Sequence, residues 1–264
     1  MLKTRGTRFP PARTRKKSER PLIGCVIFDL DDTLYDSFGQ WVRVAHRYAA
    51  RAMVRAGLKA GVEAVYKARM RAFRSDPMLR YIDTEVCRQF HATTPDAISQ
   101  AARDAYFNCP AGKLTPFPGT MPLLRHLHAC GVRSFIVSFG EPKVQHSKVR
   151  ALGLANHPHI ASFVYADRDK LLTKEAAFRQ IQKQVGLPAE QMLVVGDRPM
   201  SEIRAGNDLG MHTVRIHRGE FVAQEPQGPE EEPDFVVKSI SEVRGLAFRW
   251  GVSPKPRSAS EGSL

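Results

Sequence analysis

The sequence lacks any long apolar run. Its apolar stretches, such as Leu22 to Leu30, are short and already contain glycine and aspartate, whereas a membrane-crossing helix needs roughly 18 consecutive apolar residues. No apolar segment of signal-peptide length follows the basic N-terminus. We therefore expect neither a membrane protein nor a secreted one. An arginine-rich organelle presequence stays open, because Glu19 is the only acidic residue among the first twenty.

Cysteine is scarce as well. The four cysteines show no CxxC spacing, and in a chain of this size isolated cysteines are typical of free thiols in a reducing compartment. We therefore expect a cytoplasmic protein. The hydrophobic content of 42% is ordinary for a soluble globular protein, and 264 residues suffice for one α/β core with a modest inserted domain.

Acidic residues are few relative to basic ones, which leaves a net charge of +13. Residues 1–20 hold eight Lys or Arg against one Glu, and they contain few apolar groups. Such a segment cannot bury enough surface to offset its ordering entropy, so we expect a basic disordered arm. The arm could bind nucleic acid or another polyanion non-specifically, or have no dedicated partner.

From Pro21 onward, short β-branched runs alternate with segments of helical spacing. This alternation is typical of an α/β fold with a Rossmann-like parallel sheet, and it predicts the core in residues 21–36 and 115–248. The predicted strands are Leu22 to Asp29, Arg133 to Ser138, Ser162 to Ala166, Met192 to Asp197, His212 to Ile216 and Phe235 to Val237.

Residues 37–114 interrupt the alternation with helical periodicity and no strand-like run, which predicts a small inserted helical domain. The remaining residues, 249–264, are polar and are predicted to form a flexible tail. The predicted helices of the insertion are Gln40 to Ala56, Val62 to Phe73, Met78 to Phe90 and Ala97 to Phe107.

Three predicted strands end in a carboxylate or a hydroxyl: Asp29, Ser138 and Asp197. Ligands of open parallel sheets bind beyond the carboxyl ends of the strands, so these side chains are expected to converge. Asp29 and Asp31 are two residues apart and therefore point to the same side of an extended chain. Two carboxylates so close favour a shared proton or a hard cation. This pattern suits phosphate-ester cleavage, which needs a nucleophile and a proton donor.

With these motifs in order, residues 21–243 resemble the haloacid dehalogenase-like superfamily. Its first motif stands as Asp29-Leu30-Asp31-Asp32-Thr33, and its second as a strand ending at Ser138. Its third, a lysine that opens a helix, is best matched by Lys174, with Lys170 as a competitor. Its fourth looks like Gly196-Asp197 followed by Glu202. The inserted helices resemble the C1-type cap of this superfamily, which closes over the active site.

The resemblance implies a role for each matching residue. Asp29 attacks phosphorus and forms an aspartyl-phosphate, while Asp31 protonates the leaving group and then activates water. The phosphoryl oxygens are held by Thr33, Ser138 and Lys174. The implied cofactor is Mg²⁺, bound by the Asp29 carboxylate, the backbone carbonyl of Asp31, Asp197 and Glu202. Because the last of these acids is more often Asp in the family, direct ligation by Glu202 stays open.

These observations predict a magnesium-dependent phosphohydrolase that cleaves a small phosphorylated metabolite. A dehalogenase of the same superfamily lacks the second aspartate, so Asp31 argues against that activity. A phosphosugar mutase keeps both aspartates and stays an alternative, as does a polyanion-binding protein that uses the basic arm.

Other polar and aromatic residues have several interpretations. For Arg198 three stay open: it pairs with Asp197, it contacts the substrate, or it is exposed at the start of a helix. Trp41, Phe73 and Phe107 are interpreted as packing residues, and His126 and His128 lack the spacing of a metal pair.

Overall fold

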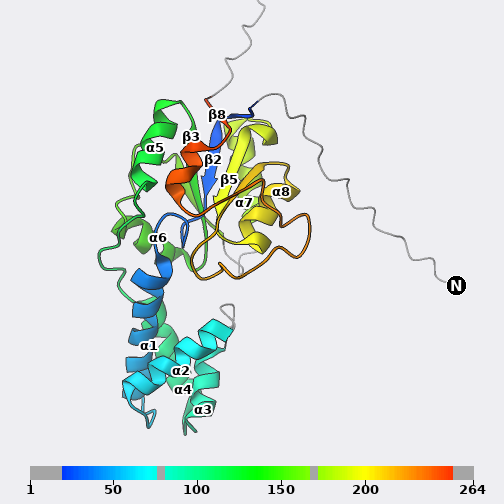
Figure 1. Ribbon diagram of the computed structural model, residues 1–264. Helices are drawn as coiled ribbons and strands as arrows, with labels where there is room; N and C mark the ends of the chain where they lie inside the picture. Colours follow the sequence, from blue (N-terminus) through cyan, green and yellow to red (C-terminus); the bar gives the residue numbers. More distant parts are fainter. Residues whose placement is uncertain (1–19, 76–80, 167–171, 252–264) are drawn as a thin grey trace, which may run out of the picture.

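The computed structural model describes residues 20–75, 81–166 and 172–251 (Figure 1). Four sequence-based predictions therefore lie outside these ranges, at least in part. They are the basic arm before Arg20, the start of the helix predicted for Met78 to Phe90, the competing lysine Lys170 and the tail beyond residue 251. Within the described ranges, no helix is both long and apolar enough to cross a membrane.

The centre of the fold is a six-stranded sheet in which every neighbouring pair is parallel. Strands buried on both faces need continuous apolar runs, and Met192–Gly196 is buried at all five positions. The predicted α/β architecture is therefore confirmed. In spatial order the strands are β4 (Ser162–Ala166), β3 (Arg133–Phe139), β2 (Cys25–Phe28), β5 (Met192–Gly196), β6 (His212–Ile216) and β7 (Phe235–Val237).

Helices cover both faces of the sheet (Figure 1). Because successive side chains of a strand point to opposite faces, Val26 and Phe28 of β2 belong to one apolar cluster, whereas Cys25 and Ile27 belong to another. The first cluster receives side chains from α5 (Thr120–Ala129), α6 (Pro142–Ala151) and the 3₁₀ segment η4 (Ile240–Gly245), the second from α7 (Lys174–Val185) and α8 (Arg204–Asp208). The short 3₁₀ segment η2 (Ala189–Gln191) precedes β5.

Two strand predictions need correction. The run from Leu22 to Asp29 is not one strand, because it divides at Gly24 into β1 (Leu22–Ile23) and β2. β1 pairs in parallel with β8 (Arg249–Trp250) in a separate two-stranded sheet. Residues 249 and 250 therefore belong to the folded part, although the sequence assigned them to the flexible tail. The two-residue strand β8 has no local hydropathy signal of its own, because it forms by pairing with residues more than 200 positions earlier in the chain.

The inserted segment folds into helices close to the predicted ranges. They are the π-helical turn η1 (Phe38–Val42), α1 (Arg43–Arg55), α2 (Val62–Ser75), α3 (Ile82–Gln89) and α4 (Pro95–Phe107). Small residues of α1, such as Ala45 and Ala49, are fully buried and let α4 approach closely. Figure 1 shows this helical unit beyond the sheet, on the side where the chain leaves β2.

The two connections between the sheet and the helical unit are bonded to each other. The side-chain amide of Gln40 donates to the carbonyl of Thr115 at 3.0 Å, and the N–H of Thr115 donates to the side-chain oxygen of Gln40 at 2.8 Å. Nearer the sheet, the N–H of Phe117 donates to the carbonyl of Leu34 at 2.8 Å. The segment that leaves the sheet and the segment that returns to it therefore lie side by side.

Candidate active site

Asp29 and Asp197 follow neighbouring strands at the centre of the sheet. The N–H of Asp29 donates to the carbonyl of Val195 at 2.9 Å, so the pairing of β2 with β5 continues to the point where both carboxylates begin. Ser138 lies near the end of β3, on the other side of β2. All three side chains are buried. Asp29, Ser138 and Asp197 therefore converge at one edge of the sheet, as the sequence predicts.

Glu202 reaches the same place through a π-helical turn, η3 (Pro199–Ile203). The N–H of Ile203 points to the carbonyl of Arg198, five residues back, as a π turn requires. The side chain of Glu202 packs directly on Gly196, where an added Cβ atom would lie 2.0 Å from its Cγ. Glycine at this position therefore makes room for the Glu202 carboxylate.

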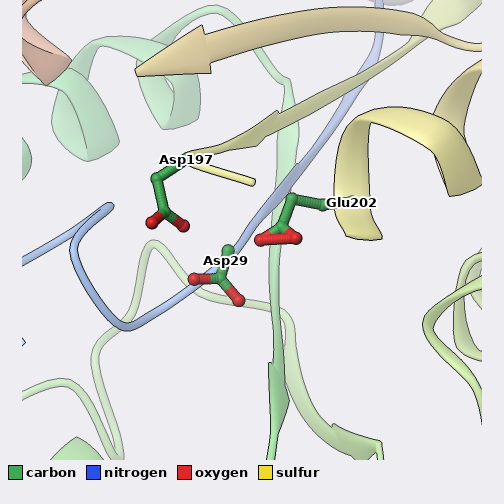
Figure 2. Close-up of side chains that lie close together, drawn as sticks. All are labelled: Asp29, Asp197 and Glu202. Atoms are coloured by element: carbon green, nitrogen blue, oxygen red, sulfur yellow. The ribbon is translucent and has the colours of Figure 1, made fainter. Parts of the chain in front are cut away.

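Asp29, Asp197 and Glu202 together form a carboxylate cluster (Figure 2). Each offers an oxygen, and these oxygens lie within 4.8 Å of one another. Burial raises the pKa of Asp29 to about 7, and burial with the nearby Glu202 and Asp29 carboxylates raises that of Asp197 well above its usual range. Asp197 Oδ1 and Glu202 Oε2 have no hydrogen-bond partner among the described residues. Buried, mutually repelling oxygens of this kind fit a hard divalent cation.

Lys174 supplies the positive charge beside this cluster. It opens α7, whose N-terminus is capped by the hydroxyl of Thr173 and whose C-terminus is Gly186 in the left-handed conformation. The ammonium lies 2.5 Å from Asp29 Oδ1 and 3.0 Å from Glu202 Oε1. Burial favours the neutral amine, but these two carboxylates raise the pKa of Lys174 to about 12. Lys174 therefore stays charged where a phosphoryl group would bind.

The carboxylate of Asp31 lies outside the cluster and has partners of its own. Its oxygens accept hydrogen bonds from the Tyr35 hydroxyl at 2.7 Å, from Gln145 at 3.1 Å and from Lys148 at 2.9 and 3.0 Å. Burial opposes ionisation, but Lys148 and these donors hold the pKa of Asp31 below its usual value. The predicted metal contact through the Asp31 backbone carbonyl stays a prediction.

The sequence did not identify Tyr35, Gln145 or Lys148 as site residues. One signal was available, because Gln145 and Lys148 are three residues apart on the helix that follows Ser138 and therefore share a face. Lys148 is only 4% exposed, and its ammonium also lies 4.2 Å from the ring centre of Trp41.

The predicted phosphate contact of Thr33 stays a prediction. It is fully buried, its hydroxyl has no partner among the described residues, and it does not line the pocket described below. The chain makes a tight turn here: Asp32 has a positive φ of 55°, and the N–H of Leu34 donates to the carbonyl of Leu30 at 3.0 Å. The alternation of an extended chain therefore ends at Asp31. Asp32 fixes the turn by accepting the N–H groups of Ser37 and Glu220.

A pocket of about 230 Å³ opens above these groups. Arg198 lines it, with its guanidinium 4.0 Å from the ring centre of Phe221. Trp41 and Phe73 are buried as packing residues should be, but both also face the pocket, and Phe107 is 44% exposed. The lining residues are Asp29, Asp31, Asp32, Ser37, Trp41, Val42, Phe73, Tyr106, Phe107, Ser138, Phe139, Gly140, Glu141, Val144, Gln145, Lys148, Lys174, Asp197, Arg198, Glu220 and Phe221.

Comparison with known sequences finds relatives along most of the chain. Glyceraldehyde 3-phosphate phosphatase of Methanopyrus kandleri is 30% identical over 229 residues, which cover 84% of this chain and 96% of the relative. The enzyme of the same name from Methanocaldococcus jannaschii is 29% identical over 225 residues, with the same coverage.

Solved structures share the fold. A predicted phosphoglycolate phosphatase from Haemophilus somnus superposes with a TM-score of 0.62 at 17% identity, and the HAD-hydrolase YfnB of Bacillus subtilis, bound to magnesium, with a TM-score of 0.59 at 20% identity. Each match covers 84% of this chain and 97% of the other. The family model for haloacid dehalogenase-like hydrolase matches residues 23–210. The chain therefore belongs to the haloacid dehalogenase-like hydrolases.

Proposed function

We propose that this chain is a magnesium-dependent phosphatase that cleaves a small phosphomonoester by nucleophilic attack of Asp29. The observation that carries the proposal is the buried group of Asp29, Asp197 and Lys174, which line the pocket, together with the adjoining Glu202. Three acidic residues and one ammonium at hydrogen-bond distance provide both a cation site and a phosphoryl contact.

The residues that would hold Mg²⁺ are Asp29, Asp197 and Glu202, together with the backbone carbonyl of Asp31. The unpartnered oxygens of Asp197 and Glu202 and the raised pKa values of Asp29 and Asp197 fit the cation. Bound there, Mg²⁺ would neutralise charge on the phosphoryl oxygens and lower the repulsion between the phosphate and the Asp29 carboxylate.

The chemistry of the chain's own residues then has two steps. In the first, a carboxylate oxygen of Asp29 bonds to phosphorus while the ester oxygen leaves with a proton from Asp31. Because Lys148 holds the pKa of Asp31 low, Asp31 takes that proton from the singly protonated phosphate of the substrate. Lys174 and the Ser138 hydroxyl stabilise the equatorial phosphoryl oxygens. In the second, Asp31 takes a proton from a water molecule that attacks phosphorus, which releases inorganic phosphate and regenerates the Asp29 carboxylate.

The pocket supports a small substrate. At about 230 Å³ it is smaller than the roughly 300–1,000 Å³ that is usual for drug-sized ligands. The relatives that match most of the chain are named for glyceraldehyde 3-phosphate, a three-carbon phosphomonoester. We propose residues 21–36 and 115–248 as the catalytic core and residues 37–114 as a cap whose closure excludes water from the reacting phosphate.

The test is the Asp29→Asn variant, assayed with p-nitrophenyl phosphate in the presence of Mg²⁺ and, for the wild-type chain, also in EDTA. We expect turnover to fall by at least about 10³-fold in the variant, because an amide cannot attack phosphorus. The matched control is Asp104→Asn, which changes an exposed aspartate of α4. Wild-type turnover by Asp29→Asn would refute the mechanism, provided that circular dichroism shows both variants to be folded.

A further inference from the structure

The pocket has two chemically different sides. The sheet side carries nine charged residues, six acidic and three basic. The helical unit contributes no charged side chain among its described residues. Apart from Ser37 at its edge, it contributes only what we call the apolar wall: Trp41, Val42, Phe73, Tyr106 and Phe107.

The uncharged character of the wall contrasts with the composition of the helices that build it. α1 and α2 are rich in arginine, yet the described arginines of the helical unit do not line the pocket. Arg69 is buried but forms an ion pair with Asp83 inside the unit. Tyr106 keeps its proton at neutral pH, because burial raises its pKa above the usual value.

The three basic residues of the sheet side are engaged with carboxylates. Lys174 contacts Asp29 and Glu202, and Lys148 contacts both oxygens of Asp31. Arg198 stabilises the ionised forms of Asp197, Glu202 and Glu220. A second anionic group on the substrate would therefore compete with a carboxylate for each of these cations.

We infer that the physiological substrate is a phosphomonoester of a small uncharged alcohol, and that the apolar wall discriminates against a second phosphate or a carboxylate on the leaving group. The inference rests on the proposed phosphatase function. A carboxylate pressed against the wall would lose its hydration without gaining a cationic partner, which is strongly unfavourable. Hydroxyl or carbonyl groups of a neutral alcohol lose much less hydration free energy. For a hydroxyl donor, Glu220 also offers an acceptor, its buried oxygen Oε1, which has no partner among the described residues.

The test compares substrates that differ only in charge. The pairs are 2-hydroxyethyl phosphate against 2-phosphoglycolate, and glycerol 3-phosphate against 3-phosphoglycerate, with p-nitrophenyl phosphate as the reference. We expect kcat/KM to be at least about tenfold higher for the neutral member of each pair. Equal values, or higher values for the anionic members, would overturn the inference. So would a higher kcat/KM for phosphoethanolamine than for 2-hydroxyethyl phosphate, since that result would indicate a cationic leaving group.

The two proposals fail in different ways. Hydrolysis of p-nitrophenyl phosphate without discrimination between the pairs would refute the inference and leave the phosphatase function intact. Absence of all phosphatase activity in Mg²⁺ would refute the proposed function, and the inference with it.

A variant tests whether the wall causes the discrimination. Phe107→Lys places a cation on the wall at a position that is already 44% exposed, so folding is expected to survive. We expect the ratio of neutral to anionic kcat/KM to fall by about tenfold. The matched control is Tyr81→Lys, because Tyr81 is 67% exposed in the same helical unit and does not line the pocket. An unchanged ratio in Phe107→Lys, or an equal change in Tyr81→Lys, would contradict the inference.

Discussion

The ammonium of Lys148 contacts both carboxylate oxygens of Asp31, at 2.9 and 3.0 Å. Lys148 comes from α6 and lies against the ring of Trp41, which belongs to the helical unit. The contact therefore links the proposed proton donor to both parts of the molecule. Under the proposed mechanism, the contact would position Asp31 for the leaving oxygen, so the effect of losing Lys148 should depend on how good the leaving group is.

We predict that Lys148→Met lowers kcat/KM for 2-hydroxyethyl phosphate by about 10–100-fold, because a poor leaving group needs the proton that Asp31 supplies. With p-nitrophenyl phosphate, whose leaving group needs little help, the loss is expected to stay below about threefold. Lys148→Arg is expected to restore part of the activity. The control is Lys143→Met, on the same helix but exposed. Equal losses on both substrates would mean that Lys148 only supports the fold.

Mg²⁺ is predicted to stabilise the protein against heat. At a concentration about 100 times its Kd, it contributes about 2.7 kcal/mol to the free energy of unfolding, which corresponds to roughly 5–10 °C in Tm for a chain of this size. Asp197→Asn is expected to abolish the rise, and without Mg²⁺ to be more stable than wild type, because it removes a buried repulsion.

The control for this prediction is Glu242→Gln, which changes an exposed glutamate of η4 and is expected to keep the full rise in Tm. Differential scanning calorimetry with Mg²⁺ and with EDTA measures both effects. An Asp197→Asn protein that still gains several degrees from Mg²⁺ would remove Asp197 from the cation site.

His46 is predicted to make the protein sensitive to acid. Its side chain is 1% exposed, neither ring nitrogen has a partner among the described residues, and burial together with Arg69 lowers its pKa to about 3. An unfolded histidine has a pKa near 6.5. Between these values the unfolded state binds more protons, so stability falls as the pH drops below about 6.5, by at most about 1.4 kcal/mol per pH unit.

The variant His46→Leu removes this proton uptake and fills the same space with an apolar group. We expect its stability relative to wild type to be greater at pH 5 than at pH 7.5, measured by urea denaturation at both pH values. His128→Gln changes an exposed histidine and is expected to show no such difference. If His46→Leu and wild type lose stability in parallel on acidification, another group controls the acid response.

Gly196→Ala is predicted to damage the carboxylate cluster without changing any carboxylate. The added Cβ atom would lie 2.0 Å from Glu202 Cγ, so the glutamate must move. We expect the apparent Kd for Mg²⁺, measured by titration of Tm, to rise at least about tenfold. Gly61→Ala adds the same atom where nothing lies within 4 Å, and it is expected to leave Mg²⁺ binding unchanged.

The sequence predicted the sheet and the main site residues well because both depend on local patterns. A buried parallel strand is a continuous apolar run, and the residue that ends it has to lie at one edge of the sheet. The apolar runs that precede Asp29, Ser138 and Asp197 were therefore sufficient to place these three residues together. Lys174 was matched through the resemblance to the third family motif, a lysine that opens a helix, and α7 does begin at Lys174.

What the sequence missed depends on tertiary packing. Lys148 and Gln145 reach Asp31 across more than 110 residues, and no periodicity encodes that contact. Three residues of the apolar wall, Trp41, Phe73 and Phe107, were interpreted as packing residues, because an aromatic residue at helical spacing has the same pattern whether it faces a core or a pocket. The positive φ of Asp32, which ends the extended chain before Thr33, has no signal in the sequence pattern either.

The paired bonds between Gln40 and Thr115 show that the chain departs from the sheet and comes back to it at a single spot. The entropy lost in closing such an excursion grows only with the logarithm of its length. A longer or shorter set of helices could thus be grafted between these two residues at little thermodynamic cost to the rest of the molecule. Exchange of the helical segment could therefore change substrate preference without moving the residues that are proposed to perform the reaction.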